Sequence, residues 1–180
     1  MGVGAILACG SGGSPSNAPS PSNDAGGDGA SGSCSADIAN GGNCNSISHF
    51  GPLVTPTCSD DAIPSGIGGT IVDGTYFLTA ETFYADVCPQ PPMSGTLVIT
   101  GYCWQQSADG QAAGESTTAS ALVVAQGNQI IVTPTCTASG ASSNATTETF
   151  TVSGTTLTLF TMNAALGNCN PDYVSVYTKQ

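Results

Sequence analysis

The residues best suited to acid–base chemistry are carboxylates scattered along the chain from residue 81 onward. No two of them share a short motif, but two that met across strands could act as a glycosidase pair, because that mechanism requires only a suitable separation. Glu81 and Glu148 are candidates for such a pair. Scattered solubilising charge is the simpler explanation. The full set is Glu81, Asp86, Asp109, Glu115, Glu148 and Asp172.

The other chemistry-bearing residues lack the partners that catalysis requires. His49 is the only histidine, and no motif supplies it with a nucleophile and an orienting group. The sequence has neither a serine nucleophile elbow nor a phosphate-binding loop. Tyr102 and Trp104 could stack on a sugar or cap an apolar cavity, although packing in a core is the favoured interpretation for such rings. The sequence therefore predicts no enzyme, no catalytic residue and no cofactor.

Cysteines are the most distinctive residues of the chain. They include no Cys-x-x-Cys pair and only one histidine could join them, so no metal site is expected. Scattered cysteines in a chain with almost no lysine are typical of disulfides formed in an oxidising compartment. The eight are Cys9, Cys34, Cys44, Cys58, Cys88, Cys103, Cys136 and Cys169.

The charge balance excludes one class of partner. Lys179 is the only lysine or arginine among 180 residues, and the formal net charge is −11. Such a chain repels phosphate backbones and anionic lipid headgroups. We therefore expect no nucleic-acid partner. The length suits one domain better than two.

The N-terminus indicates the cell envelope. Residues 1–8 (MGVGAILA) are apolar and precede Cys9, which is followed by Gly and Ser. This stretch resembles a bacterial lipobox, in which the cysteine becomes the lipid-bearing first residue. We therefore predict that residues 1–8 are part of a signal peptide and that Cys9 anchors an outer-membrane lipoprotein facing the periplasm or the cell surface. The alternative is an ordinary cysteine near an uncleaved terminus.

Two segments of different composition precede the predicted folded domain. Residues 10–33 contain only Gly, Ser, Pro, Asn, Ala and Asp. Such a segment cannot bury enough apolar surface to offset its ordering entropy, so we predict a disordered linker over residues 9–33. Residues 34–67 form a Cys-containing extension with an apolar patch. We expect covalent links, rather than a core, to order this extension.

From residue 68 to the C-terminus the sequence reads as short strands. Runs of Thr, Val, Ile, Leu and aromatic residues alternate with turn residues, among them Gly127 and Gly154. Alternation places Leu157 and Leu159 on one face. We predict an all-β domain over residues 68–180, an antiparallel meander of about seven to eight strands forming a small barrel or sandwich. The runs cover residues 76–84, 96–100, 116–125, 129–133, 147–152, 155–160 and 172–178.

Four segments of this domain carry a resemblance to known proteins. They are GGTIVDGTYFLT, GTLVIT, ETFTVSGTTLTLF and VSVYTKQ. Together they resemble Gram-negative bacterial lipoproteins of unassigned role and, more distantly, lipocalin-like small β-barrels. The resemblance implies an antiparallel barrel and, in the lipocalin-like case, an interior that binds a small apolar ligand.

The order of strands in a simple meander predicts which cysteines can meet. With seven strands of alternating direction, Cys103, Cys136 and Cys169 share one rim of the barrel. Because bridged Cα atoms lie within about 7 Å of each other, we predict a Cys136–Cys169 disulfide. The second choice is Cys44–Cys58, which would close a loop in the extension.

Three functions remain open. The leading one is a lipid-anchored, non-enzymatic envelope protein with an interaction or structural role. The second is a barrel that binds a small apolar ligand, and the third is an envelope hydrolase with paired carboxylates. A filled interior would favour the first, a hollow apolar interior the second, and two acids of raised pKa in one cleft the third. Residues expected to line a cavity are Leu97, Ile99, Val132, Leu157 and Leu159.

Overall fold

A computed structural model of the chain describes residues 34, 44–48, 51–85, 91–110, 115–137, 144–162 and 171–180. The predicted lipidation site Cys9, the predicted linker over residues 9–33, and His49 lie outside the described residues. So do Cys88 and Cys169. The described residues contain no helix long and apolar enough to cross a membrane.

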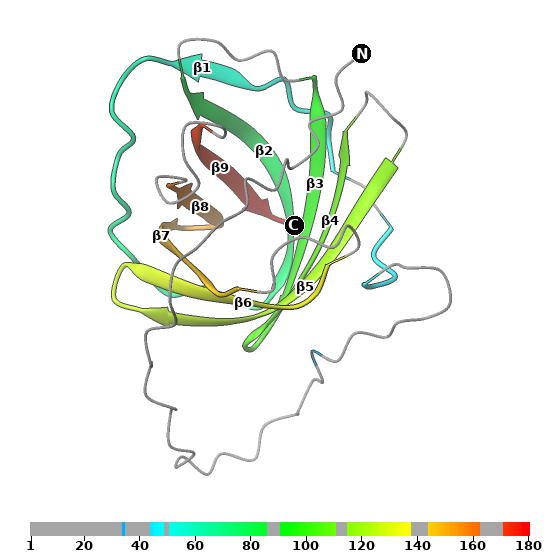
Figure 1. The fold of residues 1–180 in the computed structure, drawn as a ribbon. Helices are drawn as coiled ribbons and strands as arrows, with labels where there is room; N and C mark the ends of the chain where they lie inside the picture. Colours follow the sequence, from blue (N-terminus) through cyan, green and yellow to red (C-terminus); the bar gives the residue numbers. More distant parts are fainter. Residues whose placement is uncertain are drawn as a thin grey trace.

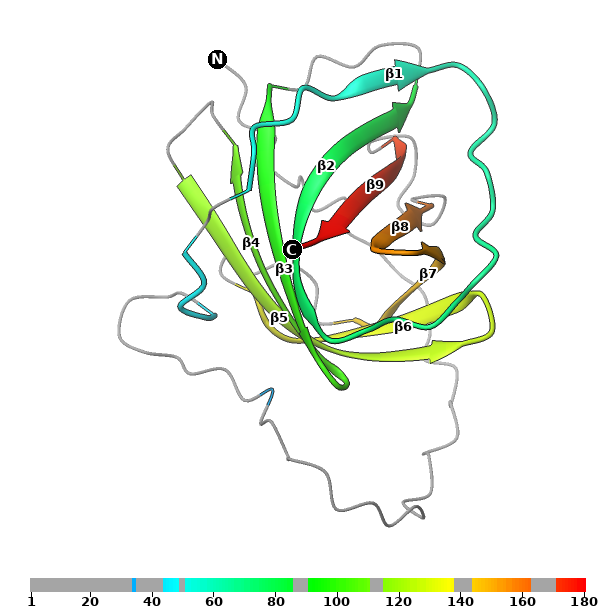
Figure 2. The ribbon, with the colours of Figure 1, turned by 180° about the vertical axis from the view of Figure 1, so that it is seen from behind.

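Nine strands follow one another around a single sheet that closes on itself (Figures 1 and 2). Eight antiparallel strands, β2 to β9, form a barrel, because β9 pairs with β2 over Tyr76–Tyr84. The short β1 adds to the outside of this ring by pairing in parallel with β2. The predicted fold class is therefore confirmed. The strands are β1 Thr57–Ser59, β2 Gly74–Tyr84, β3 Met93–Thr100, β4 Cys103–Gly110, β5 Glu115–Gln126, β6 Gln129–Thr137, β7 Thr146–Ser153, β8 Thr156–Thr161 and β9 Asp172–Lys179.

All seven predicted runs are strands, but β4 was missed. Its sequence, CWQQSADG, is mostly polar and lacks the β-branched residues that favour strands. It nevertheless pairs along its whole length with β3 and with β5. One extra strand reverses the direction of every later strand, so the strand directions on which the shared rim depended are wrong. On either side of β5, Cys103 pairs with Leu122 and Cys136 pairs with Ser120, so both cysteines lie along the barrel wall and not together on a rim.

The predicted disulfides are therefore wrong in their pairing. Cys136 is bonded to Cys44, with a Cα–Cα distance of 5.5 Å, which rules out both Cys136–Cys169 and Cys44–Cys58. Cys103 is bonded to Cys34, with a Cα–Cα distance of 5.4 Å. Cys58 is also disulfide-bonded. The predicted pairing failed for two reasons. The missed strand β4 made the predicted strand directions wrong, and cysteines of the N-terminal extension bond to cysteines of the barrel, which the prediction did not consider.

The two disulfides hold an N-terminal strap, Cys34 and residues 44–48, against the outer face of β4 to β6. The backbone NH of Cys44 donates to Thr118 Oγ1 at 2.8 Å. The side chain of Asn45 donates to the carbonyls of Gln106 and Ala119 at 3.1 and 2.8 Å, which joins β4 to β5. The buried polar residues of this outer wall thus lie beneath the strap and not on a free surface.

Residues 51–69 complete the barrel wall at two seams. β2 pairs with β3 only over Gly74–Phe77, and beyond that point β1 pairs with Thr82–Tyr84 while Val54 bridges to Met93. The second seam lies between β6 and β7, where Gly68 pairs in parallel with Thr151.

Close approach at this second seam requires glycine. A Cβ atom on Gly69 would lie 2.8 Å from the Cβ of Val152. A Cβ atom on Gly66 would collide with the backbone of Phe150. The extension over residues 51–69 is therefore part of the same hydrogen-bonded structure as the barrel.

The hydrophobic core fills one end of the barrel interior. We call it the tight-turn end, because two-residue turns join β3 to β4, β5 to β6 and β7 to β8 there, with Gly101, Gly127 and Gly154 at positive φ. Phe150 and Ile130 are completely buried in this core. The cluster consists of Tyr76, Leu78, Leu97, Ile99, Trp104, Val123, Ile130, Phe150, Leu157, Leu159 and Tyr177, together with Val54, which packs against it from the segment before β1.

Candidate functional site

Polar side chains replace apolar ones on the inner face toward the opposite end of the barrel. Glu81 comes from β2, Glu148 from β7, Thr161 from β8, and Tyr173 and Ser175 from β9. The cross-strand register places Glu81 opposite Ser175 and Thr161 opposite Tyr173. We call this half of the interior the glutamate end.

A β-bulge turns Glu81 into the barrel. Simple alternation from Tyr76 and Leu78, which face the core, would point Glu81 outward. The register between β2 and β9 shifts between Leu78 and Ala80, so Thr79 and Ala80 are both exposed and Glu81 is only 6% exposed. Bulges redirect side chains in this way and are common beside functional sites.

Glu148 reaches the interior by ordinary alternation. It precedes the buried Phe150 by two residues on β7. It is also paired across the ladder with Ile130, which is completely buried. The side chain of Thr161 hydrogen-bonds both Glu148 and Tyr173. Glu148 therefore lies on the inner face, with β8 between it and Tyr173 of β9.

Burial, with no basic partner in the described part of the chain, raises the pKa of both carboxyl groups. Burial raises the pKa of Glu81 from 4.5 to about 7, although a hydrogen bond from Ser175 opposes the shift. Burial also raises the pKa of Glu148, against a smaller opposing effect of its hydrogen bond with Thr161. Lys179 is the only lysine or arginine in the sequence. Its side chain lies against Gly74 at the tight-turn end.

The negative charges of both carboxyl groups raise the pKa values of two tyrosines, Tyr173 and Tyr177. Burial, and then the charge of Glu148, raises the pKa of Tyr173 to about 12, and Glu81 adds to this shift. Burial, followed by the charge of Glu81, holds the pKa of Tyr177 far above its usual value, and Glu148 also contributes. Because the same two phenols respond to Glu81 and to Glu148, the carboxyl groups face a common region inside the barrel.

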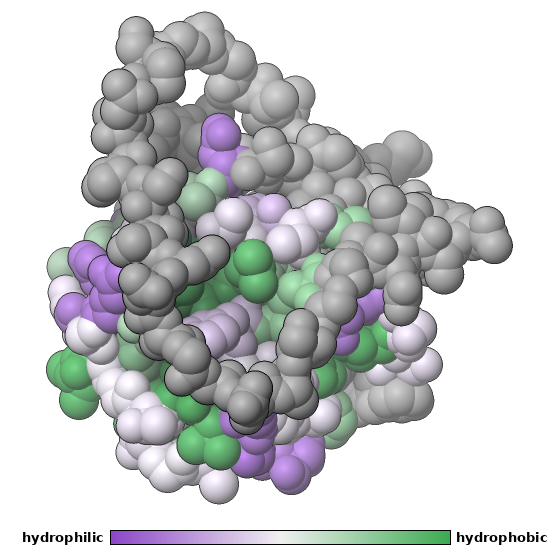
Figure 3. Space-filling model, turned by 90° about the horizontal axis from the view of Figure 1, so that it is seen from below, coloured by the Kyte–Doolittle hydropathy of each residue, from purple (hydrophilic) through white to green (hydrophobic). Residues whose placement is uncertain are grey.

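The glutamate end is accessible to solvent, whereas the tight-turn end is closed. Glu148, Thr161 and Tyr173 are half-buried. Gln106 and Thr117, which share the inner face with core residues of β3 and β5, are exposed. Side chains that point into a filled barrel would be buried, so solvent reaches part of this half of the interior. Figure 3 shows that neutral and apolar residues cover most of the described surface seen from below.

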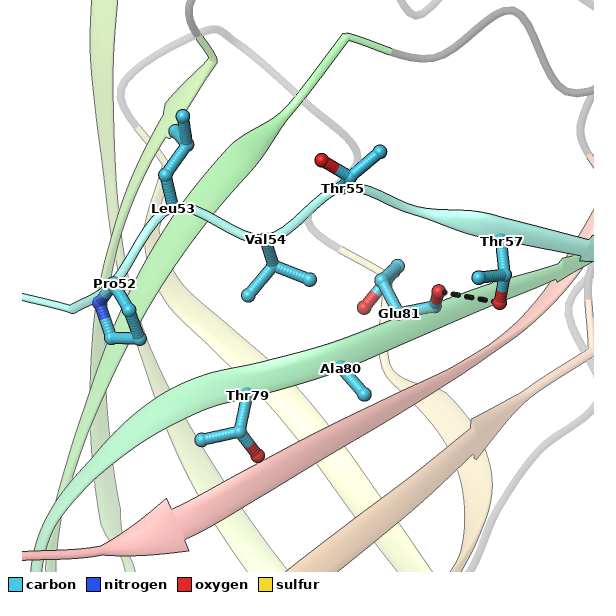
Figure 4. A pocket seen from close by; sticks show the side chains of 8 residues that line it. All are labelled: Pro52, Leu53, Val54, Thr55, Thr57, Thr79, Ala80 and Glu81. Carbon is cyan, nitrogen blue, oxygen red and sulfur yellow. Dashed lines mark hydrogen bonds between the residues drawn. The ribbon is translucent and has the colours of Figure 1, made fainter.

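Glu81 also lines a pocket in the barrel wall. It has a volume of about 380 Å³ and lies between the bulge of β2 and the segment that leads into β1 (Figure 4). Thr57 Oγ1 donates to the backbone carbonyl of Glu81 at 3.3 Å across it. The pocket exists because β1 joins β2 only from Thr82 onward. Its lining residues are Pro52, Leu53, Val54, Thr55, Thr57, Thr79, Ala80 and Glu81.

The structure separates the residues that the sequence had grouped together. Four of the five expected cavity-lining residues are core residues, and Val132 packs against that core. Trp104 is buried and Tyr102 is 72% exposed, so they form no joint stacking platform. Asp109 belongs to a strand covered by the strap, where one of its carboxylate oxygens is buried. Asp86 lies outside the described residues. The core residues are Leu97, Ile99, Leu157 and Leu159.

The sequence hypothesis named Glu81 and Glu148 but missed the groups around them. Tyr173, Ser175 and Tyr177 alternate along β9, and that pattern alone puts them on one face. What the sequence did not show is which face points inward. Pairing of Tyr177 with the buried Leu157 and Leu78 settles it.

Metal binding at this site has little support. Within the part of the chain that the structure describes, no three His, Cys, Asp or Glu side chains come together as a metal site requires.

The chain matches no known family model, and it has no match among curated proteins or among solved structures.

Proposed function

We propose that this protein is a non-enzymatic, ligand-binding barrel of the bacterial envelope, which takes up a small molecule through the glutamate end. The observation that carries the proposal is the division of the interior. One end is filled by a hydrophobic cluster, and the other presents partly accessible polar side chains on the same inner face. Small-molecule sites typically combine apolar walls with a few convergent polar groups in this way.

The packed core at the tight-turn end holds in place the strands that carry the polar groups of the glutamate end. Phe150 and Leu159 lie on the same strands as Glu148 and Thr161 and are buried. Packing of these side chains fixes the positions of the strands that carry the polar groups. A ligand would rest its apolar part on this layer and direct its polar part toward the two glutamates.

A carboxylate hydrolase is the second candidate, because Glu81 and Glu148 share one interior and both have a raised pKa. A glycosidase pair, however, needs one protonated acid and one ionised carboxylate, with environments that push the two pKa values apart. Here burial shifts both groups in the same direction, which favours binding over hydrolysis. Turnover of nitrophenyl glycosides that is lost in Glu81→Gln would reverse this preference.

The lipid anchor on Cys9 remains part of the proposal. Its support is the lipobox-like sequence before Cys9 and the small-residue linker over residues 9–33. Two or more acyl chains would hold the barrel stably at the membrane, at about 0.8 kcal/mol per buried CH₂ group. Mass spectrometry of the N-terminus of the native protein tests this. An intact Met1 terminus with unmodified Cys9 would contradict it.

Binding in the barrel can be tested with a neutral apolar fluorophore, N-phenyl-1-naphthylamine. Trp104 is the only tryptophan and lies in the core, so a ligand inside the barrel should accept its excitation energy. We expect saturable energy transfer at one probe per chain. Ala119→Phe, which adds bulk to the inner face, should weaken it, whereas Thr133→Phe on the outer face should not.

Two results would contradict the proposal. One is the absence of saturable energy transfer, which would mean that the interior does not admit the probe. The other is equal binding by both phenylalanine variants, which would place the probe on the outer surface.

A further inference from the structure

We infer that the ligand of the barrel is an organic cation, a primary or secondary amine on an apolar body, whose ammonium group is held between Glu81 and Glu148. This inference rests on the proposed function, because it names the chemical class that the barrel would select. It adds a charge preference that binding to an apolar cavity would not require.

The two carboxyl groups converge on one region from different sides of the barrel. Glu81 is on β2 and Glu148 on β7, and β9 and β8 lie between these strands in the closed sheet. The charges of both groups raise the pKa values of the phenols of Tyr173 and Tyr177. An ammonium group near these phenols would therefore interact with both carboxylates at once.

Among the residues that the structure describes, neither carboxyl group has a positively charged partner. Each receives a hydroxyl hydrogen bond, Glu81 from Ser175 and Glu148 from Thr161. Lys179 is four residues beyond Ser175 on β9, which corresponds to roughly 13 Å along a strand. Buried carboxylates are normally paired with a charge, since an isolated one is strongly destabilising. A cationic ligand would supply the missing partner.

Aromatic side chains at the same end suit a cation with an apolar body. The rings of Phe83 and Tyr173 lie 5.8 Å apart, centroid to centroid. Phe83 and Tyr173 are also cross-strand partners on the inner face. Aromatic faces attract ammonium groups by roughly 0.5–2 kcal/mol. The neighbouring hydrophobic layer would accept the rest of the ligand.

Other ligand classes fit less well. Anions would be repelled by both glutamates and by the net charge of −11. Calcium prefers about six to eight oxygen ligands, including several carboxylates, and the described residues hold no such group. A neutral apolar molecule would leave the carboxyl groups unused. An organic amine uses the carboxyl groups, the rings and the apolar layer together.

Amine binding should depend on pH in a defined direction. The ammonium group interacts favourably only with the ionised carboxylates, so binding competes with their protonation. Because the pKa of free Glu81 is about 7, affinity should rise as the pH increases through that value. A neutral ligand should show no such rise. This comparison needs no variant and so does not depend on whether a mutant folds.

The test uses three probes that share one dansyl fluorophore and one linker, with the full disulfide-bonded chain. Dansylcadaverine is a cation, its N-acetyl derivative is neutral, and dansylaminohexanoate is an anion. We expect the cation to bind at least about tenfold more tightly than the neutral probe at a pH of about 8, a difference of about 1.4 kcal/mol. Glu81→Gln and Glu148→Gln should each remove most of this preference. Asp61→Asn, which removes one exposed surface charge, is the matched control.

The outcomes separate the inference from the proposed function. Equal affinity for the cationic and neutral probes would overturn the inference and leave a ligand-binding barrel. Preference for the anion, or displacement of the cation by millimolar calcium, would also overturn it. Failure of all three probes, together with failure of N-phenyl-1-naphthylamine, would overturn the proposed function itself.

Discussion

The two ends of the barrel interior are built from the same strands but carry opposite chemistry. On β2, Tyr76 and Leu78 lie in the core at the tight-turn end, whereas Glu81 follows them at the glutamate end. On β7, Phe150 lies in the core and Glu148 precedes it by two residues. One end therefore contributes stability through burial. The other buries carboxyl groups at a cost to stability, which is typical of a site retained for function.

The largest effect should come from the filled end. Phe150→Ala removes a completely buried ring from the centre of the core, and such changes destabilise by about 3–5 kcal/mol. Urea unfolding followed by circular dichroism measures the loss. The control is Thr147→Ala on the exposed side of the same strand, with an expected change below about 1 kcal/mol. Equal losses for the two variants would show that the interior of this end is not a packed core.

The next effect concerns the disulfide that ties the strap near the glutamate end. Replacing Cys44 and Cys136 together by serine opens a link between residues 92 positions apart in the sequence. Loss of such a link typically destabilises by about 2–4 kcal/mol through the unfolded chain. Non-reducing peptide mapping should find Cys44–Cys136 and Cys34–Cys103 in the wild type. A map with Cys136 bonded to Cys169 would contradict the strand order.

A somewhat smaller effect, of about 2–3 kcal/mol, is expected at the glutamate end and depends on pH. Between about pH 4.5 and pH 7 the folded state keeps the proton of Glu81 that the unfolded state has released. Stability should therefore fall as the pH rises through this interval. The difference between the unfolded-state pKa of 4.5 and the folded-state pKa of about 7 corresponds to about 3 kcal/mol, which is the upper limit of this effect. Glu81→Gln should remove that fall and be more stable than the wild type at about pH 8. A variant whose stability followed the wild-type pH profile would show that Glu81 is solvated.

The smallest effect tests a polar group within the filled end. The hydroxyl of Tyr76 donates to the carbonyl of Val72, so Tyr76→Phe removes one hydrogen bond without opening a cavity. The expected loss is about 0.5–1.5 kcal/mol, measured by the same urea titration. A loss as large as that of Phe150→Ala would mean that polar contacts and not packing dominate this end.

Much of the fold could be predicted from sequence because its strands follow the period-two pattern. Leu157 and Leu159 face the core as their alternation indicated, and the turns at Gly127 and Gly154 join the expected hairpins. The polar strand β4 could not be predicted in this way. Its inner face carries Trp104 and its outer face is covered by the strap, so tertiary contacts and not propensity make it a strand.

The candidate site was only partly predictable. Glu81 and Glu148 were named as acids that could meet across strands, and the structure places both inside the barrel. For Glu81 this depends on the bulge after Leu78, which alternation does not reveal. The tyrosines of β9 carried a readable pattern, but their inward face became clear only from pairing with core residues such as Leu157. Local patterns define the faces, whereas register decides which one is buried.

The most direct test of the central claim is a pH titration of the glutamate side-chain carboxyl carbons by ¹³C NMR, with Glu81→Gln and Glu148→Gln to assign the signals. The division of the interior predicts that Glu81 titrates with a pKa of about 7 and Glu148 above its ordinary value of 4.5. Addition of dansylcadaverine should lower both pKa values. Titration of both groups near 4.5, with no response to the amine, would show that the carboxylates are solvated and would contradict the account.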